Sequence, residues 1–143
     1  AMGNVNVSKF HGRVTGPGGF IDLAQHTKKL ILMGTFTAGG LREHCEGGRL
    51  VIDREGKYQK FKTDIEQVTF SGDYAAAHGQ HVLVVTERAV FRLTPQGLML
   101  TEIAPGVDLE RDILSQMEFR PLIADDLQLM DGRIFQPNPM GLS

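Results

Sequence analysis

The sequence has little that would link it to a disulfide framework, a nucleic acid or a membrane. Among 143 residues there is one cysteine, Cys45, and no tryptophan, so an intrachain disulfide is excluded and a reducing, cytoplasmic setting fits best. Basic residues never run beyond Lys28-Lys29, and the formal net charge is -2, which argues against a nucleic-acid partner. No apolar run approaches the roughly 20 residues that span a bilayer, so no membrane association is expected.

The remaining composition is that of one ordinary globular domain. Hydrophobic residues make up 41% and charged residues 22% of the chain, and both values are near the averages of folded proteins. A chain of this length buries roughly two-thirds of the surface that it exposes when unfolded. We therefore expect one α/β domain with more strand than helix. Residues 1–2 are interpreted as an expression scar, and residues 136–143, with two prolines and a glycine, as a loose tail.

Hydrophobic periodicity places the expected strands. Alternation predicts a strand at residues 4–8, and the apolar run at 29–36 is typical of a strand buried on both faces of a sheet. Residues 48–62 alternate about the turn sequence Arg-Glu-Gly-Lys at 54–57, which indicates a hairpin with one wet face. Further strands are expected in residues 65–72 and, as three stretches broken at 86–88 and 95–97, in residues 81–106.

Two helices are expected, together with one segment that the pattern leaves open. Residues 21–27 carry a short helical face. The clearest helix covers residues 108–119, where Asp108 can cap the amino end. Its apolar stripe consists of Leu109, Ile113, Leu114 and Met117. Residues 72–80 are either a brief helical turn or a loop.

Two glycine-rich segments are the strongest candidates for a ligand-binding loop, because glycine lets backbone N–H groups approach a ligand closely. The first, Gly-Pro-Gly-Gly-Phe at 16–20, is not the dinucleotide fingerprint, since Ile21 stands where a third glycine is needed and Pro17 has no N–H. The second, at 34–41, has P-loop glycine spacing but lacks the phosphate-binding lysine and hydroxyl. Taken alone, each segment is either a structural turn or a ligand loop.

Three polar groupings give weaker signals. His78 and His81 lie three apart but have no third ligand close in sequence, so no metal site is expected. Nothing around Cys45 marks an activated thiol, and we interpret it as an ordinary residue. The charged pairs Glu87-Arg88 and Glu110-Arg111 could be ion pairs or partner contacts, but we interpret them as solvated surface.

Five longer segments carry a family resemblance. They are GNVNVS (3–8), GPGGFIDLAQHTKKLILMGTFTAGG (16–40), EQVTFSG (66–72), VTERAVFRLT (85–94) and LTEIAPGVDLERDILSQMEFRPLIADDLQLMD (100–131). In this order they resemble the carboxy-terminal part of a family I CoA-transferase, of the acetate/propionate or acetyl-CoA:acetoacetyl-CoA transferase type. The resemblance covers residues 3–135. It implies an open mixed β-sheet with flanking helices, which is the second-half domain of that family in truncated form.

The resemblance also implies a reaction. CoA would move from a short-chain acyl-CoA to a free carboxylic or keto acid, and in the family a glutamate carboxylate forms a glutamyl-CoA thioester on the way. Backbone N–H groups stabilise the oxyanion of each addition. The family's glycine motif falls on residues 16–20, which makes Gly19 the leading N–H donor and Gly18 the next.

Five further residues are predicted to face the CoA or acyl group on the same basis. Gly16 and Phe20 belong to the glycine motif itself. Thr35, Phe36 and Thr37 follow an apolar strand and would lie at the carboxyl edge of a sheet, where ligands of open α/β sheets bind. The alternative for these three residues is a purely structural strand end.

One element of the family pattern is missing. The nucleophilic glutamate of the family lies in a Glu-Asn-Gly motif upstream of the glycine loop, and no such motif occurs here; Glu46-Gly47-Gly48 comes after the loop. We therefore expect a fragment that is inactive alone, from a cytoplasmic, homo-oligomeric parent enzyme. Its partner would be the missing amino-terminal half, CoA would be a substrate, and no bound cofactor or metal is expected. The alternatives are a stand-alone CoA-binding or interaction module and an NAD-dependent oxidoreductase.

Overall fold

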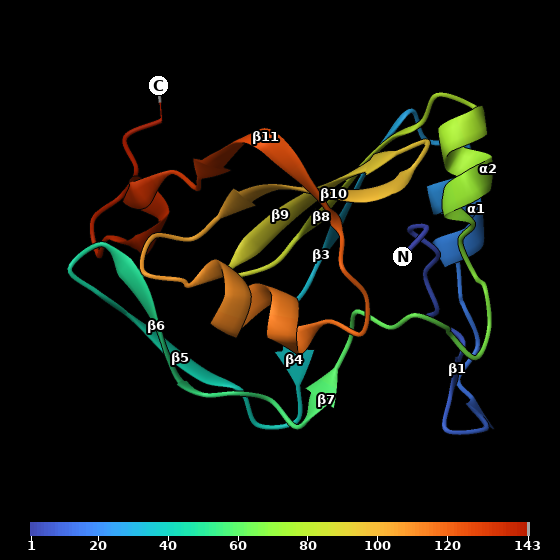
Figure 1. Cartoon of the computed structure of the whole chain (residues 1–143). Coiled ribbons are helices and arrows are strands. Elements are labelled where there is room, and N and C mark those ends of the chain that lie inside the picture. Colours follow the sequence, from blue (N-terminus) through green and yellow to red (C-terminus); the bar gives the residue numbers. More distant parts are fainter. Residues whose placement is uncertain (143) are drawn as a thin grey trace.

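The structure, a computed structural model, describes residues 1–142 and is built around one five-stranded sheet (Figure 1). The strands are β1 (Lys9–Phe10), β2 (Arg13–Val14), β3 (Lys29–Met33), β4 (Thr37–Ala38), β5 (Arg42–Glu46), β6 (Arg49–Arg54), β7 (Tyr58–Gln59), β8 (His81–Val85), β9 (Ala89–Thr94), β10 (Gly97–Ile103) and β11 (Leu122–Leu129). The helical elements are α1 (Phe20–His26), α2 (Gly72–Ala77), a π-helical turn (Leu109–Ile113) and two 3₁₀ turns (Leu114–Gln116 and Gly132–Phe135).

The main sheet is mixed, with the strand order β11-β10-β9-β8-β3. β3 runs parallel to β8, and β11 runs parallel to β10, whereas β8, β9 and β10 are joined in antiparallel fashion. The other strands form three two-stranded ladders, β1–β2, β4–β7 and β5–β6. The expected α/β class with an open mixed sheet is confirmed. The division of the chain at residues 2 and 135 stays a prediction, and Ser143 of the expected tail lies outside the described residues.

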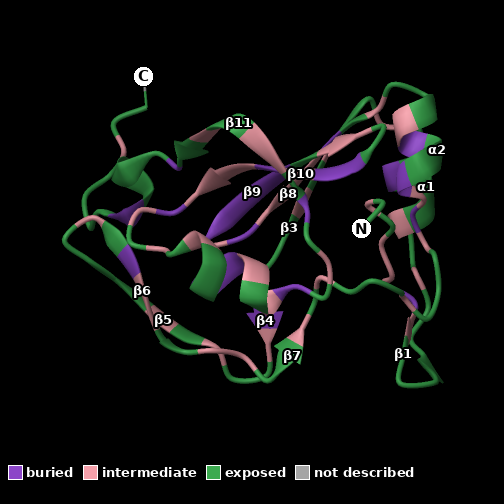
Figure 2. Ribbon diagram, viewed as in Figure 1, coloured by how far each residue is buried: buried purple, intermediate pink, exposed green. Residues whose placement is uncertain are grey.

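Apolar clusters hold the covering elements against this sheet. α1 and α2 lie beside each other at one end of the sheet (Figure 1), where a cluster of Ala24, Phe70, Ala75 and Val82 joins them to β8. The helical turns at 109–116 pack on the middle strands. The largest cluster consists of Phe36, Ala89, Phe91, Leu98, Leu100, Ile113 and Met117. Figure 2 shows the resulting concentration of buried residues along β9.

Several expected elements are present. α1 corresponds to the predicted helix at 21–27, and β8, β9 and β10 are the three strands predicted within 81–106. Residues 72–77 are helical rather than a loop. Asp108 caps the predicted helix through its carboxylate, which accepts a hydrogen bond from the Arg111 N–H at 2.7 Å. The helix itself is shorter than predicted and consists of the π-helical and 3₁₀ turns.

The prediction that residues 29–36 are buried on both faces is wrong. Only Leu30 and Leu32 pack against the cluster under the helices, whereas Ile31 is 58% and Met33 79% exposed. The reason is the position of β3, which is an edge strand of the sheet and is covered on one face only within the described residues.

The predicted hairpin about residues 54–57 is also wrong. β6 pairs with β5 instead, and β7 pairs with β4. Gly47 and Gly48 connect β5 to β6 with φ values of 58° and 76°. A two-residue turn with two positive φ angles matches the twist of a hairpin, so this turn sets the pairing of β6. The predicted strands at 4–8 and 65–72 are reduced to a single bridge between Val5 and Phe70.

Candidate functional site

The first part of the candidate site is the glycine loop, residues 16–20. Gly16 and Gly18 have φ values of +78° and +54°, a conformation that favours glycine, whereas Gly19 has an ordinary φ of -80°. Inside the loop the Phe20 N–H donates to the Pro17 carbonyl oxygen at 3.1 Å, and the Leu23 N–H donates to the Gly19 carbonyl oxygen at 3.1 Å. The loop is therefore a tight turn that leads directly into α1.

The glycine loop presents free backbone donors. Within residues 1–142, the N–H groups of Gly18 and Gly19 donate no hydrogen bond to the protein. A Cβ atom added to Gly16, Gly18 or Gly19 would meet no heavy atom within 4 Å. Gly18 and Gly19 are both exposed, so their two adjacent N–H groups are available to an external acceptor, as stabilisation of a carbonyl oxygen or an oxyanion requires.

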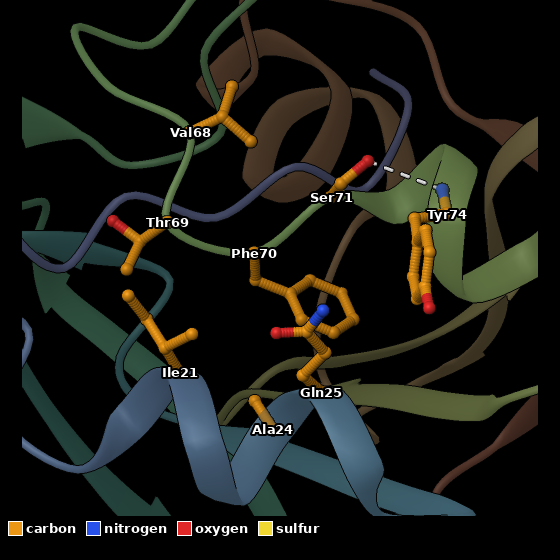
Figure 3. Close-up of a pocket in the computed structure, with 8 residues that line it drawn as sticks. All are labelled: Ile21, Ala24, Gln25, Val68, Thr69, Phe70, Ser71 and Tyr74. Atoms are coloured by element: carbon orange, nitrogen blue, oxygen red, sulfur yellow. Dashed lines mark hydrogen bonds between the residues drawn. The ribbon is translucent and has the colours of Figure 1, made fainter.

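A pocket of about 320 Å³ begins directly after the loop, along α1 (Figure 3). It lies between α1 and the segment that leads into α2. Figure 3 shows the Phe70 ring pointing toward α1, and the Ser71 hydroxyl accepts a hydrogen bond from the Tyr74 N–H at 3.2 Å. The lining residues, none of them charged, are Ile21, Ala24, Gln25, Val68, Thr69, Phe70, Ser71 and Tyr74. These walls suit an apolar or neutral group.

The second part of the candidate site is formed where the parallel strands β3 and β8 end. The Gly34 N–H donates to the Val85 carbonyl oxygen at 3.2 Å, so the segments that follow the two strands leave the sheet at the same edge. These segments are residues 35–37 and 86–88. Carboxyl edges of this kind are where open α/β sheets bind ligands.

A buried arginine organises this edge. The Arg88 side chain is fully buried, and its Nε donates to Glu87 at 2.7 Å. Its Nη1 donates to Glu55 at 2.6 Å and to the Asp112 carbonyl oxygen at 3.1 Å. The guanidinium carbon lies 5.0 Å from the centre of the Phe36 ring. We call Arg88, Glu87, Glu55, Phe36 and Thr37 the Arg88 cluster.

Glu87 and Arg88 are therefore not solvated surface, and that prediction is wrong; they form the ion pair that was the alternative. The second predicted pair, Glu110 and Arg111, does lie at the surface, but each residue has another partner. Arg111 pairs with Asp112 at 2.7 Å, and Glu110 pairs with Arg120 at 3.3 Å. No sequence signal distinguished the two pairs, because burial of Arg88 depends on strands that are distant along the chain.

The Arg88 cluster holds the predicted ligand segment at residues 35–37. The Phe36 N–H donates to Glu87 Oε2 at 2.8 Å, and the Thr37 hydroxyl donates to Glu55. Phe36 and Thr37 are fully buried inside the chain, whereas Thr35 is exposed. Of the three predicted pocket residues, Thr35 is thus the one whose side chain a ligand can reach. Their role in ligand binding stays a prediction, as do the roles of Gly16, Gly18, Gly19 and Phe20.

The charges at this edge shift the pKa values of neighbouring groups in opposite directions. Burial acts to raise the pKa of Glu55, but hydrogen bonds from Arg88 and Thr37 outweigh it and hold that pKa below its ordinary value. Burial and the nearby carboxylates of Glu87 and Glu55 raise the pKa of Glu43. The Glu43 Oε2 atom has no hydrogen-bond partner within the described residues. One carboxylate is therefore stabilised in its charged form and the other is destabilised.

The remaining sequence candidates lie apart from these two parts. The His78 ring stacks on Tyr74, with 3.9 Å between the ring centres, and Cys45 is exposed on β5. Within residues 1–142, no group of three potential metal ligands comes together. In the same residues, no helix has the length and apolar character needed to cross a bilayer.

Comparison with known proteins identifies the class first: the chain is homologous to one segment of CoA-transferases. It is 50% identical over 139 residues to acetate CoA-transferase YdiF of Escherichia coli K12, and 48% identical over 149 residues to caffeate CoA-transferase of Acetobacterium woodii. These alignments cover 97% and 98% of this chain but only 26% and 28% of the two relatives. The chain thus spans about a quarter of the relatives that it matches. No protein-family model matches the chain.

Among solved structures, the chain resembles that of acyl-CoA transferase YdiF from E. coli O157:H7, determined as a thioester complex with CoA. The TM-score is 0.97 at 48% identity, over 99% of this chain and 28% of that one. A variant of the decarboxylase AibA/AibB matches at a TM-score of 0.58 and 15% identity, which shows a shared fold only. The resemblance inferred from the five sequence segments is confirmed.

Proposed function

We propose that the chain is the carboxy-terminal quarter of a CoA-transferase that moves CoA between a short-chain acyl-CoA and a free carboxylic acid. The observation that carries the proposal is the match to the YdiF thioester complex at a TM-score of 0.97 over 99% of this chain. In such an enzyme CoA is a substrate rather than a resident cofactor. The partner of the chain is the rest of the same enzyme, which we expect to be cytoplasmic and homo-oligomeric.

In this proposal the glycine loop supplies the oxyanion donors. Addition to a thioester places negative charge on the carbonyl oxygen, and preorganised N–H groups stabilise that charge. The N–H groups of Gly19 and Gly18 are adjacent and donate to no acceptor in the described chain. Gly16 and Phe20 are the first and last residues of the loop. We assign them, together with residues 35–37, to contact with CoA.

The nucleophile is assigned to a part of the enzyme outside this chain. No Glu-Asn-Gly motif occurs in the sequence. Without that carboxylate no glutamyl-CoA thioester can form, so the isolated chain is expected to have no transferase activity. The parent enzyme is expected to be active.

Two substitutions at Gly19 test the oxyanion role in the parent enzyme. Gly19→Pro removes the N–H, and its φ of -80° is one that proline adopts. Gly19→Ala is the matched control, because it keeps the N–H and its Cβ meets no protein atom within 4 Å. We expect Gly19→Pro to lower kcat by about 10²–10³-fold and Gly19→Ala to lower it far less. A Gly19→Pro enzyme that folds, as judged by its thermal melt, and keeps its kcat would overturn the assignment.

Calorimetry separates the proposal from its two alternatives. The isolated chain is titrated with acetyl-CoA and with NAD. A fragment whose site is completed by the rest of the enzyme should bind neither ligand tightly. Tight binding of acetyl-CoA would support a stand-alone CoA-binding module, and tight binding of NAD would support a nucleotide-dependent oxidoreductase.

A further inference from the structure

One peptide group at the carboxyl edge of β3 is held at both of its polar ends by charged side chains. It is the peptide between Thr35 and Phe36. Its carbonyl oxygen accepts a hydrogen bond from Lys60 Nζ at 2.6 Å, and its N–H donates to Glu87 Oε2 at 2.8 Å. The two side chains come from positions 25 and 51 residues further along the chain. We call Lys60 and Glu87 the peptide clamp.

The charges of the peptide clamp match the dipole of the peptide group. The cation lies at the carbonyl oxygen and the anion lies at the N–H, and charge-assisted hydrogen bonds of this kind are roughly twice as strong as neutral ones. A reversed peptide would turn its N–H toward the ammonium and its carbonyl oxygen toward the carboxylate. Because both of those contacts are repulsive, the clamp selects one orientation of this peptide.

Each member of the peptide clamp has a defined position. Glu87 accepts a hydrogen bond at 2.7 Å from Nε of Arg88, whose side chain is fully buried. The Lys60 ammonium lies close to the backbone of Gly34, because a Cβ atom added to that glycine would come within 3.1 Å of Nζ. Gly34 thus leaves room for the ammonium, but a glycine restricts the backbone before Thr35 less than any other residue would. The clamp supplies the restraint that Gly34 does not.

The orientation of this peptide decides what Thr35 presents to a ligand. Thr35 is exposed, whereas Phe36 is fully buried. The Thr35 hydroxyl donates to the Thr37 carbonyl oxygen at 2.7 Å, which leaves the hydroxyl oxygen as an acceptor. A turn of the peptide between Thr35 and Phe36 would displace this oxygen together with the backbone.

We propose that Lys60 and Glu87 are positioning residues that fix the peptide between Thr35 and Phe36, so that Thr35 meets acyl-CoA in one orientation. This inference rests on the proposed function, which assigns residues 35–37 to contact with CoA. Both clamp residues act through the peptide rather than through a contact of their own with the substrate. Loss of either one therefore weakens the binding of acyl-CoA more than it slows the chemical step.

Steady-state kinetics of the full-length parent test the inference. Lys60→Met removes the ammonium and keeps most of the side chain, and Lys57→Met is the matched control, because Lys57 is also exposed and lies three positions away. Glu87→Gln removes the charge of the other clamp residue. We expect Lys60→Met and Glu87→Gln each to raise KM for acyl-CoA by about tenfold, with kcat changed by less than about twofold. Lys57→Met should change neither constant. Lys60 is exposed, so Lys60→Met should leave the thermal melt unchanged, which separates positioning from a loss of folded protein.

The double variant Lys60→Met/Glu87→Gln decides whether the two residues act through one peptide. If they do, KM should rise about tenfold, as in each single variant, whereas independent contacts with the substrate would multiply to about a hundredfold. Amide exchange of residues 34–37, followed by mass spectrometry on the same samples, should be faster in both single variants than in Lys57→Met.

Three results would each overturn the inference: an unchanged KM in Lys60→Met, a hundredfold rise in the double variant, or unchanged amide exchange in both single variants. An active wild-type parent with any of these results refutes this inference alone. An inactive wild-type parent would refute the proposed function, and with it this inference.

Discussion

The glycine loop and the Arg88 cluster differ in whether their polar groups have hydrogen-bond partners within the protein. The loop leaves the N–H groups of Gly18 and Gly19 without protein acceptors and surrounds its glycines with open space. The Arg88 cluster satisfies its donors with carboxylates and carbonyl oxygens and excludes solvent from Phe36 and Thr37. The comparison teaches that the loop leaves backbone donors available for the predicted ligand, whereas the satisfied and buried groups of the cluster hold the sheet edge in position.

The largest expected effect comes from removing the buried guanidinium. Arg88→Ala leaves Glu87 and Glu55 without their cationic partner, and breaking a buried ion pair costs about 3–5 kcal/mol. Because the Glu55 side chain is 27% exposed, we expect the lower end of that range in the free energy of unfolding, measured by urea denaturation of the isolated chain. Arg111→Ala is the control, since that side chain is 74% exposed and its loss should cost far less than the loss of Arg88. If Arg88→Ala and Arg111→Ala lowered the free energy of unfolding equally, burial of the Arg88 guanidinium would not be the cause of its larger predicted effect.

Glu55→Gln should destabilise the chain less and in a pH-dependent way. The folded state holds the pKa of Glu55 below its ordinary value, so its charge stabilises the fold above the unfolded-state pKa, and this contribution is lost as pH falls through the folded-state pKa. We expect a cost of about 1–2 kcal/mol at pH 7 that shrinks toward pH 3. Urea denaturation at the two pH values measures it, and a pH-independent cost would refute the ionic role.

Glu43→Gln should change the free energy of unfolding at pH 7 in the opposite direction, by increasing it. The pKa of Glu43 is raised in the folded state, so the fold favours the protonated form. Its contribution is present below the unfolded-state pKa and is lost as pH rises through the folded-state pKa. The neutral glutamine should therefore increase the free energy of unfolding at pH 7, by about 1 kcal/mol or less, and change it little near pH 3. If urea denaturation showed that Glu43→Gln lowers the free energy of unfolding at pH 7, charged Glu43 would be stabilising and the prediction would be wrong.

In the glycine loop, alanine substitutions at two neighbouring glycines should change the stability differently, and Gly19→Ala should have the smallest cost of all the variants. Gly18→Ala places a side chain at a φ of +54°, which costs about 1–2 kcal/mol. Gly19→Ala, at a φ of -80°, should leave the unfolding free energy unchanged or raise it by about 0.4–1 kcal/mol. Thermal melts of the isolated chain compare the two variants. A large destabilisation by Gly19→Ala would show that the loop is packed rather than open.

Much of the local structure could be predicted from the sequence. The period of the apolar residues predicted α1 and strands β8 to β10, and Asp108 was recognised as a cap because it precedes an amphipathic segment. The resemblance across residues 3–135 indicated the class from the sequence alone, and homology to CoA-transferases confirms it. Each of these signals depends on residues close together in the sequence or on the order of successive segments, so one sequence is enough to reveal it.

Long-range pairing was the part that the sequence pattern missed. The pairing of β6 with β5 depended on which of two glycine-containing turns closed the hairpin, and β11 was not anticipated at all. The apolar run at 29–36 gave the same signal that a central strand gives, although β3 lies at an edge. Hydrophobicity shows that a residue favours burial, but it does not say which neighbour provides the cover.

The sequence by itself thus determined the glycine loop, its place before a short helix and the class of enzyme from which the segment derives. Only the tertiary structure decided that Arg88 is buried between Glu87 and Glu55 and that Met33 is exposed. The physical reason is that turns and helix caps are set by residues a few positions apart, whereas the burial of a charge depends on partners that the folded sheet brings together from 33 positions away.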